Sequence, residues 1–175
     1  MYANLFGDYV KGSQYNQYSN KVVQGIQLHR EIDYYFDQHP IILEVRRSLY
    51  PVLPKISSVA VDLYIDHLLA KNWSVFHKKK FVDYLEEFYT HDSKIFDEFP
   101  ELFLSFINAL KKNKWINYYQ FESGLDKACK GVSNRISFPN NLMNGLKYFK
   151  TNEERLNEAF LNFMTDANKK FEIYY

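Results

Sequence analysis

A run of polar side chains in the stretch VQGIQLHREIDYYFDQHP, residues 23–40, has the residue types and spacing of a metal or acid–base site. His29, Asp33 and Asp37 follow one another at intervals of four residues, which places them on one face of a helix. A histidine and an aspartate so placed can ligate one metal ion, or the aspartate can orient the imidazole. Exposed helix faces carry such pairs too, so the spacing alone leaves both interpretations open.

A second group of ionisable residues lies in VDLYIDHLLAKNW, within the most apolar stretch of the chain. Asp62 and Asp66 are four residues apart, and His67 follows at once. Charged side chains are seldom buried without a partner, so this group favours a metal-binding or catalytic role. The alternative is a salt bridge inside the bundle between Asp62 or Asp66 and an arginine. The arginines that could form it are Arg30, Arg46 and Arg47.

The N-terminal stretch ANLFGDYVKG is a third polar segment, with Asn4, Asp8 and Lys11 around its glycines. Taken by itself it is typical of a polar turn in which Asp8 caps a helix. Together, the three segments offer carboxylate and imidazole ligands, which suit Mn²⁺ or Mg²⁺ in a site that handles phosphate. The sequence therefore favours metal-assisted phosphoester hydrolysis, in which Lys11 and Arg30 hold the phosphate.

Helices must position these residues, because apolar side chains recur at helical spacing and we find no convincing alternating strand. We expect helices over residues 20–38, 40–50, 55–76, 79–91, 101–112 and 118–135, with a shorter segment before Pro100. The 55–76 helix is apolar on most sides, which predicts a central position. The breaker SFPNN precedes a short helix that ends near Lys150. Thr151 and Glu154 then predict a capping box for the last helix.

The composition narrows the class of protein. The 175 residues are 46% hydrophobic and show no repeat or linker, so we expect an all-α, single-domain helical bundle over residues 1–175.

A formal net charge of +1 gives no general attraction to nucleic acid. The single cysteine, Cys129, argues against disulfides and thiolate zinc sites and favours a reducing cytoplasm. No apolar run is long enough for a bilayer and the start is unlike a signal peptide, so we expect neither membrane insertion nor secretion.

Three motifs in this order, ANLFGDYVKG, GIQLHREIDYYFDQHP and VDLYIDHLLAKNW, resemble those of the acyl carrier protein phosphodiesterases, also called acyl carrier protein hydrolases. The motifs lie in the first half of the chain. The resemblance implies an all-α fold that is distantly similar to the HD-type phosphohydrolases. It also implies a Mn²⁺-dependent reaction that cleaves the phosphodiester between 4′-phosphopantetheine and a serine of holo acyl carrier protein, which leaves the apo protein.

The resemblance carries the family's functional positions onto this chain residue by residue. It implies metal ligation, with Mn²⁺ or alternatively Mg²⁺, by Asp8, His29, Asp66 and His67. Asp33 and Asp62 complete the expected catalytic set, as further ligands or as supports of ligands. Substrate contacts are expected from Asn4, Lys11 and Arg30, and from Lys55, which stands where the family has an arginine. Which of these residues activates water is left open.

Two other functions stay open at this stage. Family members begin earlier, in a segment of the kind NFLAH that this sequence lacks, so we expect either that the start of the protein lies further upstream or that the protein has lost this N-terminal segment. Its loss favours a non-catalytic relative that still binds acyl carrier protein, and an HD-like phosphohydrolase acting on a nucleotide is the third possibility. An acidic protein substrate requires a local basic patch, for which HKKK, residues 77–80, and KKNK, residues 111–114, qualify. Both runs are more often solvated helix ends, and the sequence gives no oligomeric state.

Overall fold

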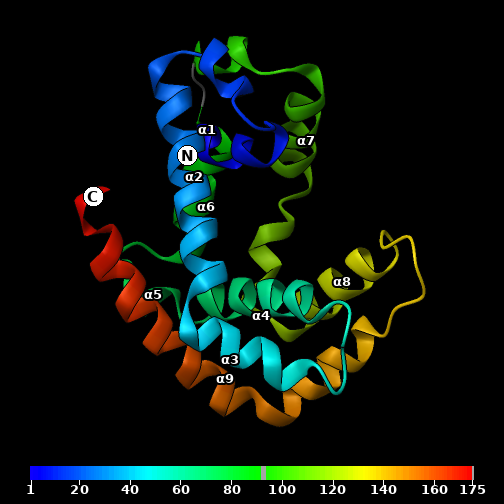
Figure 1. Ribbon diagram of the computed structural model, residues 1–175. Coiled ribbons are helices and arrows are strands. Elements are labelled where there is room, and N and C mark those ends of the chain that lie inside the picture. Colours follow the sequence, from blue (N-terminus) through cyan, green and yellow to red (C-terminus); the bar gives the residue numbers. More distant parts are fainter. Residues whose placement is uncertain (92–93, 175) are drawn as a thin grey trace. The chain divides into compact units, whose positions relative to one another are not determined.

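In the computed structural model, which describes residues 1–91 and 94–174, every regular element is a helix (Figure 1). The all-α prediction is therefore confirmed. Within the described residues, no helix is both long and apolar enough to cross a membrane. The chain divides into two compact units, the first formed by residues 1–38 and 85–114 and the second by residues 39–84 and 115–175. The single domain stays a prediction, because a division by contacts does not decide whether two units fold separately.

The first unit is built around α2 (Asn20–Gln38), which matches the helix predicted for those residues. The other elements of this unit are α1 (Tyr2–Leu5), η1 (Phe6–Tyr9), η2 (Gln14–Gln17), most of α6 (Phe81–Thr90), η3 (Lys94–Glu98) and α7 (Glu101–Asn113). The N–H and hydroxyl of Ser19 donate to the Glu98 carboxylate at 2.8 and 2.7 Å. This pairing ties the start of α2 to η3.

Aromatic packing fixes the N-terminal turns α1 and η1 in the first unit. The ring of Phe6 lies 4.8 Å from that of Phe99 and 5.0 Å from that of Phe103, centroid to centroid. Tyr2 stacks on Phe88 at 4.8 Å and donates its hydroxyl proton to the Phe88 carbonyl. Such contacts stabilise beyond the area they bury. These contacts hold the segment that carries Asp8 in place, although this segment contains only short helical turns.

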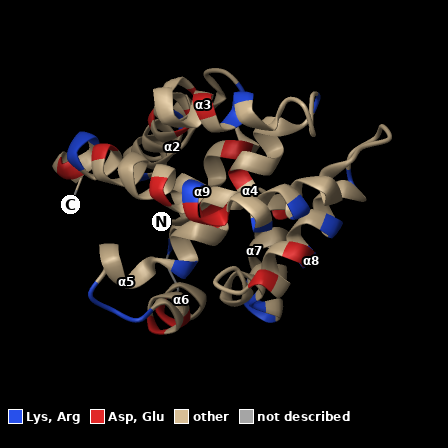
Figure 2. Cartoon of the chain, turned by 90° about the horizontal axis from the view of Figure 1, so that it is seen from below, with Lys and Arg blue, Asp and Glu red and all other residues tan. Residues whose placement is uncertain are grey.

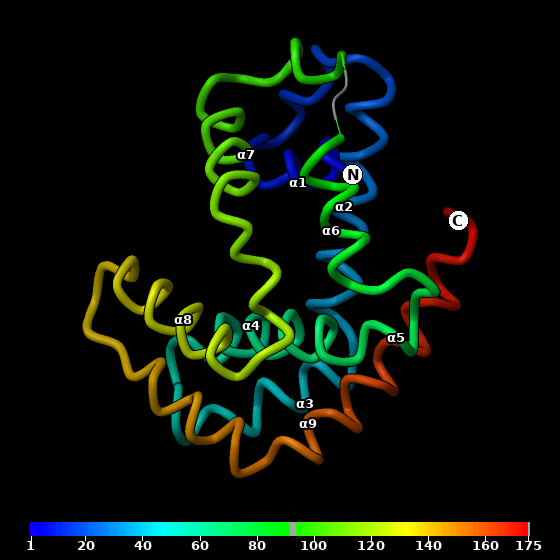
Figure 3. The backbone as a smooth tube through the Cα atoms, turned by 180° about the vertical axis from the view of Figure 1, so that it is seen from behind, coloured from blue at the N-terminus to red at the C-terminus, as the bar shows by residue number. Residues whose placement is uncertain are grey.

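The second unit is built around α4 (Ser57–Lys71), which contacts α3, α8 and α9 (Figure 3). The other elements of this unit are α3 (Pro40–Leu49), α5 (Trp73–Phe76), η4 (Trp115–Tyr118), α8 (Glu122–Ser133), α9 (Leu142–Phe171) and η5 (Glu172–Tyr174). Tyr64 of α4 is fully buried and donates its hydroxyl proton to the Gly145 carbonyl at 2.5 Å. The central position predicted for this helix is confirmed.

Two details of the predicted helices are wrong. The predicted 55–76 helix ends at Lys71 because the Asn72 side chain bonds the Leu68 carbonyl and Asn157, each at 2.8 Å, and α5 starts afresh. The predicted capping box does not form, since Thr151 lies inside α9 and its hydroxyl donates to the Lys147 carbonyl at 3.0 Å. The helix nevertheless kinks at Asn152, next to the predicted boundary.

Candidate metal centre

Two glycines let the N-terminal turns approach α2 closely. A Cβ atom built on Gly25 would lie 2.4 Å from the Cβ of Ala3, and one on Gly7 would lie 2.2 Å from the His29 ring. Real Cβ atoms do not reach such distances, so each position admits only glycine at this separation. The missing side chains allow α1 and η1 to pack directly on α2, and Asp8, next to Gly7, thereby reaches His29.

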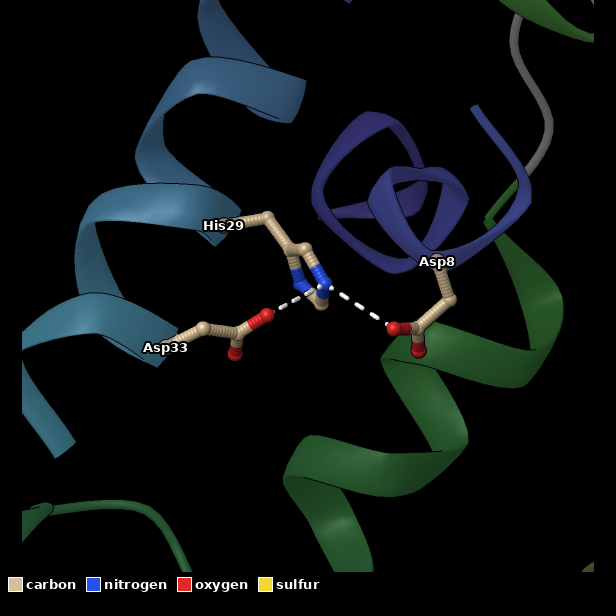
Figure 4. Close-up of side chains that lie close together, drawn as sticks. All are labelled: Asp8, His29 and Asp33. Atoms are coloured by element: carbon tan, nitrogen blue, oxygen red, sulfur yellow. Dashed lines mark hydrogen bonds and ion pairs between the residues drawn. The ribbon is translucent and has the colours of Figure 1, made fainter. Parts of the chain in front are cut away.

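Asp8, His29 and Asp33 form a compact cluster in the first unit (Figure 4). The Nε2 atom of His29 lies 3.1 Å from Asp8 Oδ1 and 3.1 Å from Asp33 Oδ2. All three ligand atoms lie within 4.8 Å of one another. The exposed fractions are 16% for the imidazole, 74% for the Asp8 side chain and 57% for the Asp33 side chain. The imidazole is therefore mostly buried, whereas the two carboxylates are exposed to solvent.

The three groups alter one another's proton affinity. The hydrogen bond to His29 lowers the pKa of Asp8 below its usual value. The same hydrogen bond, with the charges of both carboxylates, raises the pKa of His29 against the opposing effect of burial. Burial raises the pKa of Asp33, aided by the charge of Asp8 and opposed by His29. Asp8 is thus the carboxylate that most readily stays ionised.

One nitrogen cannot satisfy two carboxylates. Nε2 of His29 carries a single proton at most, and that proton makes a good hydrogen bond to only one of the two oxygens at 3.1 Å. A divalent cation in the same place would be held by an imidazole nitrogen and two carboxylate oxygens, a donor set that suits Mn²⁺ and also Mg²⁺. The exposed carboxylates leave room for solvent or substrate oxygens. The cluster therefore fits the metal that the sequence predicts.

Arg30, expected to contact phosphate, is bound to the backbone of the neighbouring turn. Its two terminal nitrogens donate to the carbonyls of Gly12 at 2.7 Å and Val10 at 2.8 Å. The guanidinium also lies 4.8 Å from the ring centroid of Tyr15. Arg30 therefore clamps the turn that carries the exposed Lys11, and a phosphate contact by either residue stays a prediction.

Asn4, also expected to contact substrate, is half-buried in α1 beside the close approach to Gly25. Its backbone N–H donates to the Met1 carbonyl at 3.0 Å. Asn4 therefore lies one turn before Asp8 in the chain, and its contact with substrate stays a prediction.

Asp62 and Asp66 lie in the second unit, one turn apart on the exposed side of α4. Although part of Asp66 meets solvent, surrounding protein atoms desolvate its carboxyl, and this effect with the charge of Asp62 raises its pKa to about 7. The alternative that an arginine pairs with Asp62 or Asp66 stays a prediction as well, and the guanidinium of Arg30 donates to two backbone carbonyls of the first unit. A ligand role for both aspartates stays a prediction.

His67 is buried in the second unit, with an exposed fraction of 2%. Its Nδ1 donates to the Tyr119 carbonyl at 2.6 Å, which leaves Nε2 as a lone pair without a hydrogen-bond partner. Metal-ligating histidines have this arrangement, but Leu63 and Leu125 border the small hollow beside the ring. Burial lowers the pKa of His67. The ring is therefore held in its neutral form with a lone pair on Nε2, and its ligand role stays a prediction.

Lys55 lies in the second unit just before α4 and is exposed. Its ammonium is 6.0 Å from the centroid of the Phe138 ring. That distance is at the limit of a cation–π contact, so the side chain is weakly held. The expected substrate contact by Lys55 stays a prediction.

Comparison with known proteins adds an independent line of support. The family model described as acyl carrier protein phosphodiesterase matches residues 1–167 of the chain. The chain belongs to this family. The acyl carrier protein phosphodiesterase from Salmonella agona (strain SL483) is 28% identical over 136 residues, which cover 75% of this chain and 69% of that protein. The protein of the same name from Salmonella newport (strain SL254) is 27% identical over the same coverage. No solved structure matches this member of the family.

The acyl carrier protein phosphodiesterase family is a family of hydrolases, so this chain is an enzyme of that class. The match extends through the second half of the chain, where the sequence analysis found no motif. Gly7 and Gly25 are parts of the site that were not predicted from the sequence. The sequence did carry a signal, because a glycine directly before Asp8 and another inside the predicted 20–38 helix can each indicate close backbone approach.

Proposed function

We propose that this enzyme hydrolyses the phosphodiester that joins 4′-phosphopantetheine to a serine of holo acyl carrier protein, with Mn²⁺ or Mg²⁺ at the Asp8–His29–Asp33 cluster. Water adds to phosphorus and the bond from phosphorus to the serine oxygen breaks. The serine oxygen takes up a proton, which gives apo carrier protein, and phosphopantetheine leaves. The family, whose relatives are named for this activity, supports the substrate.

The observation that carries the metal part of the proposal is the convergence of two carboxylates on one imidazole nitrogen. The residues come from the first two motifs and meet because α1 and η1 pack on α2. When bound, the cation supplies Lewis-acid stabilisation of the charge that develops on the phosphate in the transition state. The lowered pKa of Asp8 keeps one ligand anionic across the physiological range.

The residues in the cluster and in the turn beside it have binding and positioning roles. His29, the least exposed of the three, would bind the cation through Nε2, and Asp8 and Asp33 would bind it through their carboxylate oxygens. Arg30 holds the Val10–Gly12 turn, which presents the ammonium of Lys11 toward solvent. An ammonium on an ordered turn is suited to contact a phosphate oxygen as a point charge.

A comparison of substrates tests this proposal. Purified protein with Mn²⁺ is incubated with holo acyl carrier protein and, separately, with nucleoside mono-, di- and cyclic phosphates, and the products are followed by mass. We expect the carrier to lose the mass of phosphopantetheine while the nucleotides stay intact. Cleavage of nucleotides alone would replace the proposal with a nucleotide phosphohydrolase. Binding of the carrier without cleavage would replace it with a non-catalytic binding protein.

A further inference from the structure

The second unit contains an open groove that lies outside the Asp8–His29–Asp33 cluster. Its volume is about 630 Å³ and its walls come from α4, α5, α6, α9 and η5. The apolar part of its lining consists of Leu69, Trp73, Phe76, Tyr84 and Met164. Aromatic side chains and methionine are enriched where proteins bind one another. The groove therefore has the composition of a protein-binding surface.

The wall that α5 and α6 give to this groove is held in place by contacts within the second unit. The Trp73 ring lies 4.7 Å from the Tyr84 ring, centroid to centroid, and its indole N–H donates to the Lys79 carbonyl at 2.9 Å. Phe76 packs edge-on against the buried ring of Phe160 at 5.8 Å. A wall that is already ordered loses little conformational entropy when a partner binds. The groove is thus preformed.

Two exposed apolar side chains are neighbours of lining residues in the chain. Val75, with an exposed fraction of 66%, stands in α5 between Trp73 and Phe76. Ile173, with an exposed fraction of 82%, follows the lining residue Glu172 in η5. The same surface therefore combines a hollow with apolar projections. A two-fold interface requires both features in one patch, because the patch meets its own copy.

The groove lining carries one lysine and one glutamate, Lys169 and Glu172. They are three residues apart at the end of α9, where the backbone of Glu172 is still helical, so they share a face. Figure 2 shows both signs of charge on the last turns before the C-terminus, whereas α5 carries none. Among the described residues, neither side chain has an ion-pair partner.

A two-fold axis makes this pair of charges complementary to itself. If the last turn of α9 packs antiparallel on its own copy, Lys169 of each chain lies opposite Glu172 of the other. An acidic partner would be repelled by Glu172, and a small apolar ligand would make no use of either charge. A second copy supplies both opposite charges in the required order.

We propose that the groove binds a second copy of this chain, and that the protein is a homodimer in which α9 and η5 pack about a two-fold axis. Ile173 of each copy enters the hollow of the other beside Met164, and Lys169 and Glu172 form two equivalent ion pairs. The inference is independent of the proposed function. The polar part of the surface, residues 168–172, also lies beyond the part of the chain that the family model matches.

Charge reversal tests the ion pairs, with the dimer dissociation constant measured by sedimentation equilibrium. Lys169→Glu and Glu172→Lys each turn both pairs into like-charge contacts, so we expect either variant to raise the dissociation constant roughly tenfold or more at low salt. An equimolar mixture of the two variants restores opposite charges across the interface, and the mixture is expected to dimerise as the wild type does. Lys112→Glu makes the same charge change at an exposed lysine outside the groove and is expected to have no effect.

The apolar contact is tested by Ile173→Ser, with thermal unfolding as the check on folding. We expect weaker dimerisation, because the variant loses the apolar side chain that the partner's groove covers. The matched control is Leu102→Ser in the first unit, where an apolar side chain with an exposed fraction of 73% lies outside the groove. This control is expected to keep the wild-type dissociation constant.

Three results would overturn the inference. The first is a wild type that sediments as a monomer at every concentration, including one in which Lys169→Glu raises KM for the carrier, since the groove would then belong to the substrate. The second is a dimer that Lys169→Glu, Glu172→Lys and Ile173→Ser all leave intact, because it would form through another surface. The third is a mixture of the two charge variants that stays monomeric, because Lys169 would then not face Glu172.

Discussion

Glycine at position 7 decides whether the cluster forms. The His29 ring occupies the space that a Cβ atom of residue 7 would fill, at 2.2 Å. Gly7→Ala must therefore push η1 away from α2, and we expect a loss of roughly 1–3 kcal/mol in the free energy of unfolding, as for other overpacked sites. Mn²⁺ affinity, measured by calorimetric titration, should fall as Asp8 moves from His29.

The matched control is Gly131→Ala, at an exposed helical position of α8 with nothing within 4 Å of the added Cβ. Because alanine favours helix over glycine, we expect this variant to gain roughly 0.5–1 kcal/mol and to bind Mn²⁺ as the wild type does. Wild-type Mn²⁺ affinity in Gly7→Ala would show that the close approach does not matter for the site.

The thiol of Cys129 gives a pH-dependent prediction that is independent of the site. Burial raises its pKa from 9.0 to about 11. The unfolded chain therefore releases this proton at lower pH than the folded protein, so the thiol's contribution is present below pH 9 and is lost as the pH rises from 9 toward 11. Urea unfolding at several pH values should show a steeper loss of stability for the wild type than for Cys129→Ala.

Labelling with a thiol reagent is a simpler test of the burial of Cys129. Cys129 is fully buried, so the native protein should react slowly at pH 8 and the urea-unfolded protein at once. Fast labelling of the native protein, or equal pH slopes for the wild type and Cys129→Ala, would contradict the burial of this side chain.

Residue types and spacing predicted the cluster only in part. The four-residue interval fixed that His29 and Asp33 share a face of α2, which the structure confirms. Asp8 was offered as a candidate by its residue type, but its assignment as a ligand came from the family resemblance, because a contact between residues 21 positions apart depends on packing that no local pattern encodes. The roles of Asp66 and His67 as ligands stay predictions for the same reason, since they belong to another unit.

At the scale of elements, Arg30 controls the turn between η1 and η2. Its guanidinium bonds two carbonyls of that turn and stacks near Tyr15, and Gly12 within the turn has a φ of 54°. Arg30→Lys keeps the charge but loses the planar fork, so we expect a loss of roughly 1–2 kcal/mol in stability. Backbone amides of residues 10–14 should exchange hydrogen faster.

If Arg30 instead bound phosphate through both terminal nitrogens, Arg30→Lys would raise KM and leave amide exchange in the turn unchanged. That result would contradict the clamp. Lys21→Arg, a conservative change at an exposed lysine of the same helix, is the control and should alter neither quantity.

Helix positions followed from periodicity more reliably than helix ends. The start and end of α2 matched the prediction, and the end did so because Pro40 gives a strong local signal for the start of the next helix. The end of α4 was missed because it depends on Asn157, a residue of α9 to which Asn72 donates. Thr151 failed as a cap because its hydroxyl found an acceptor inside the helix at Lys147.

At the scale of the whole molecule, the motifs divide between the two units. The first two motifs build the Asp8–His29–Asp33 cluster within the first unit, and the third motif supplies Asp62, Asp66 and His67 to α4 of the second. The family match over residues 1–167 includes both units, so the activity is proposed for the chain as a whole.

The rate at which holo acyl carrier protein becomes apo protein, read from intact mass, tests the central claim most directly. The wild type, Asp8→Asn and Asp97→Asn are compared with Mn²⁺ and with a chelator, since Asp97 is an exposed carboxylate of the same unit outside the cluster. We predict that the wild type and Asp97→Asn convert the carrier only with metal, and that Asp8→Asn is slower by roughly a hundredfold or more. Equal rates for Asp8→Asn and the wild type, or conversion unaffected by the chelator, would contradict a metal-dependent reaction at this cluster.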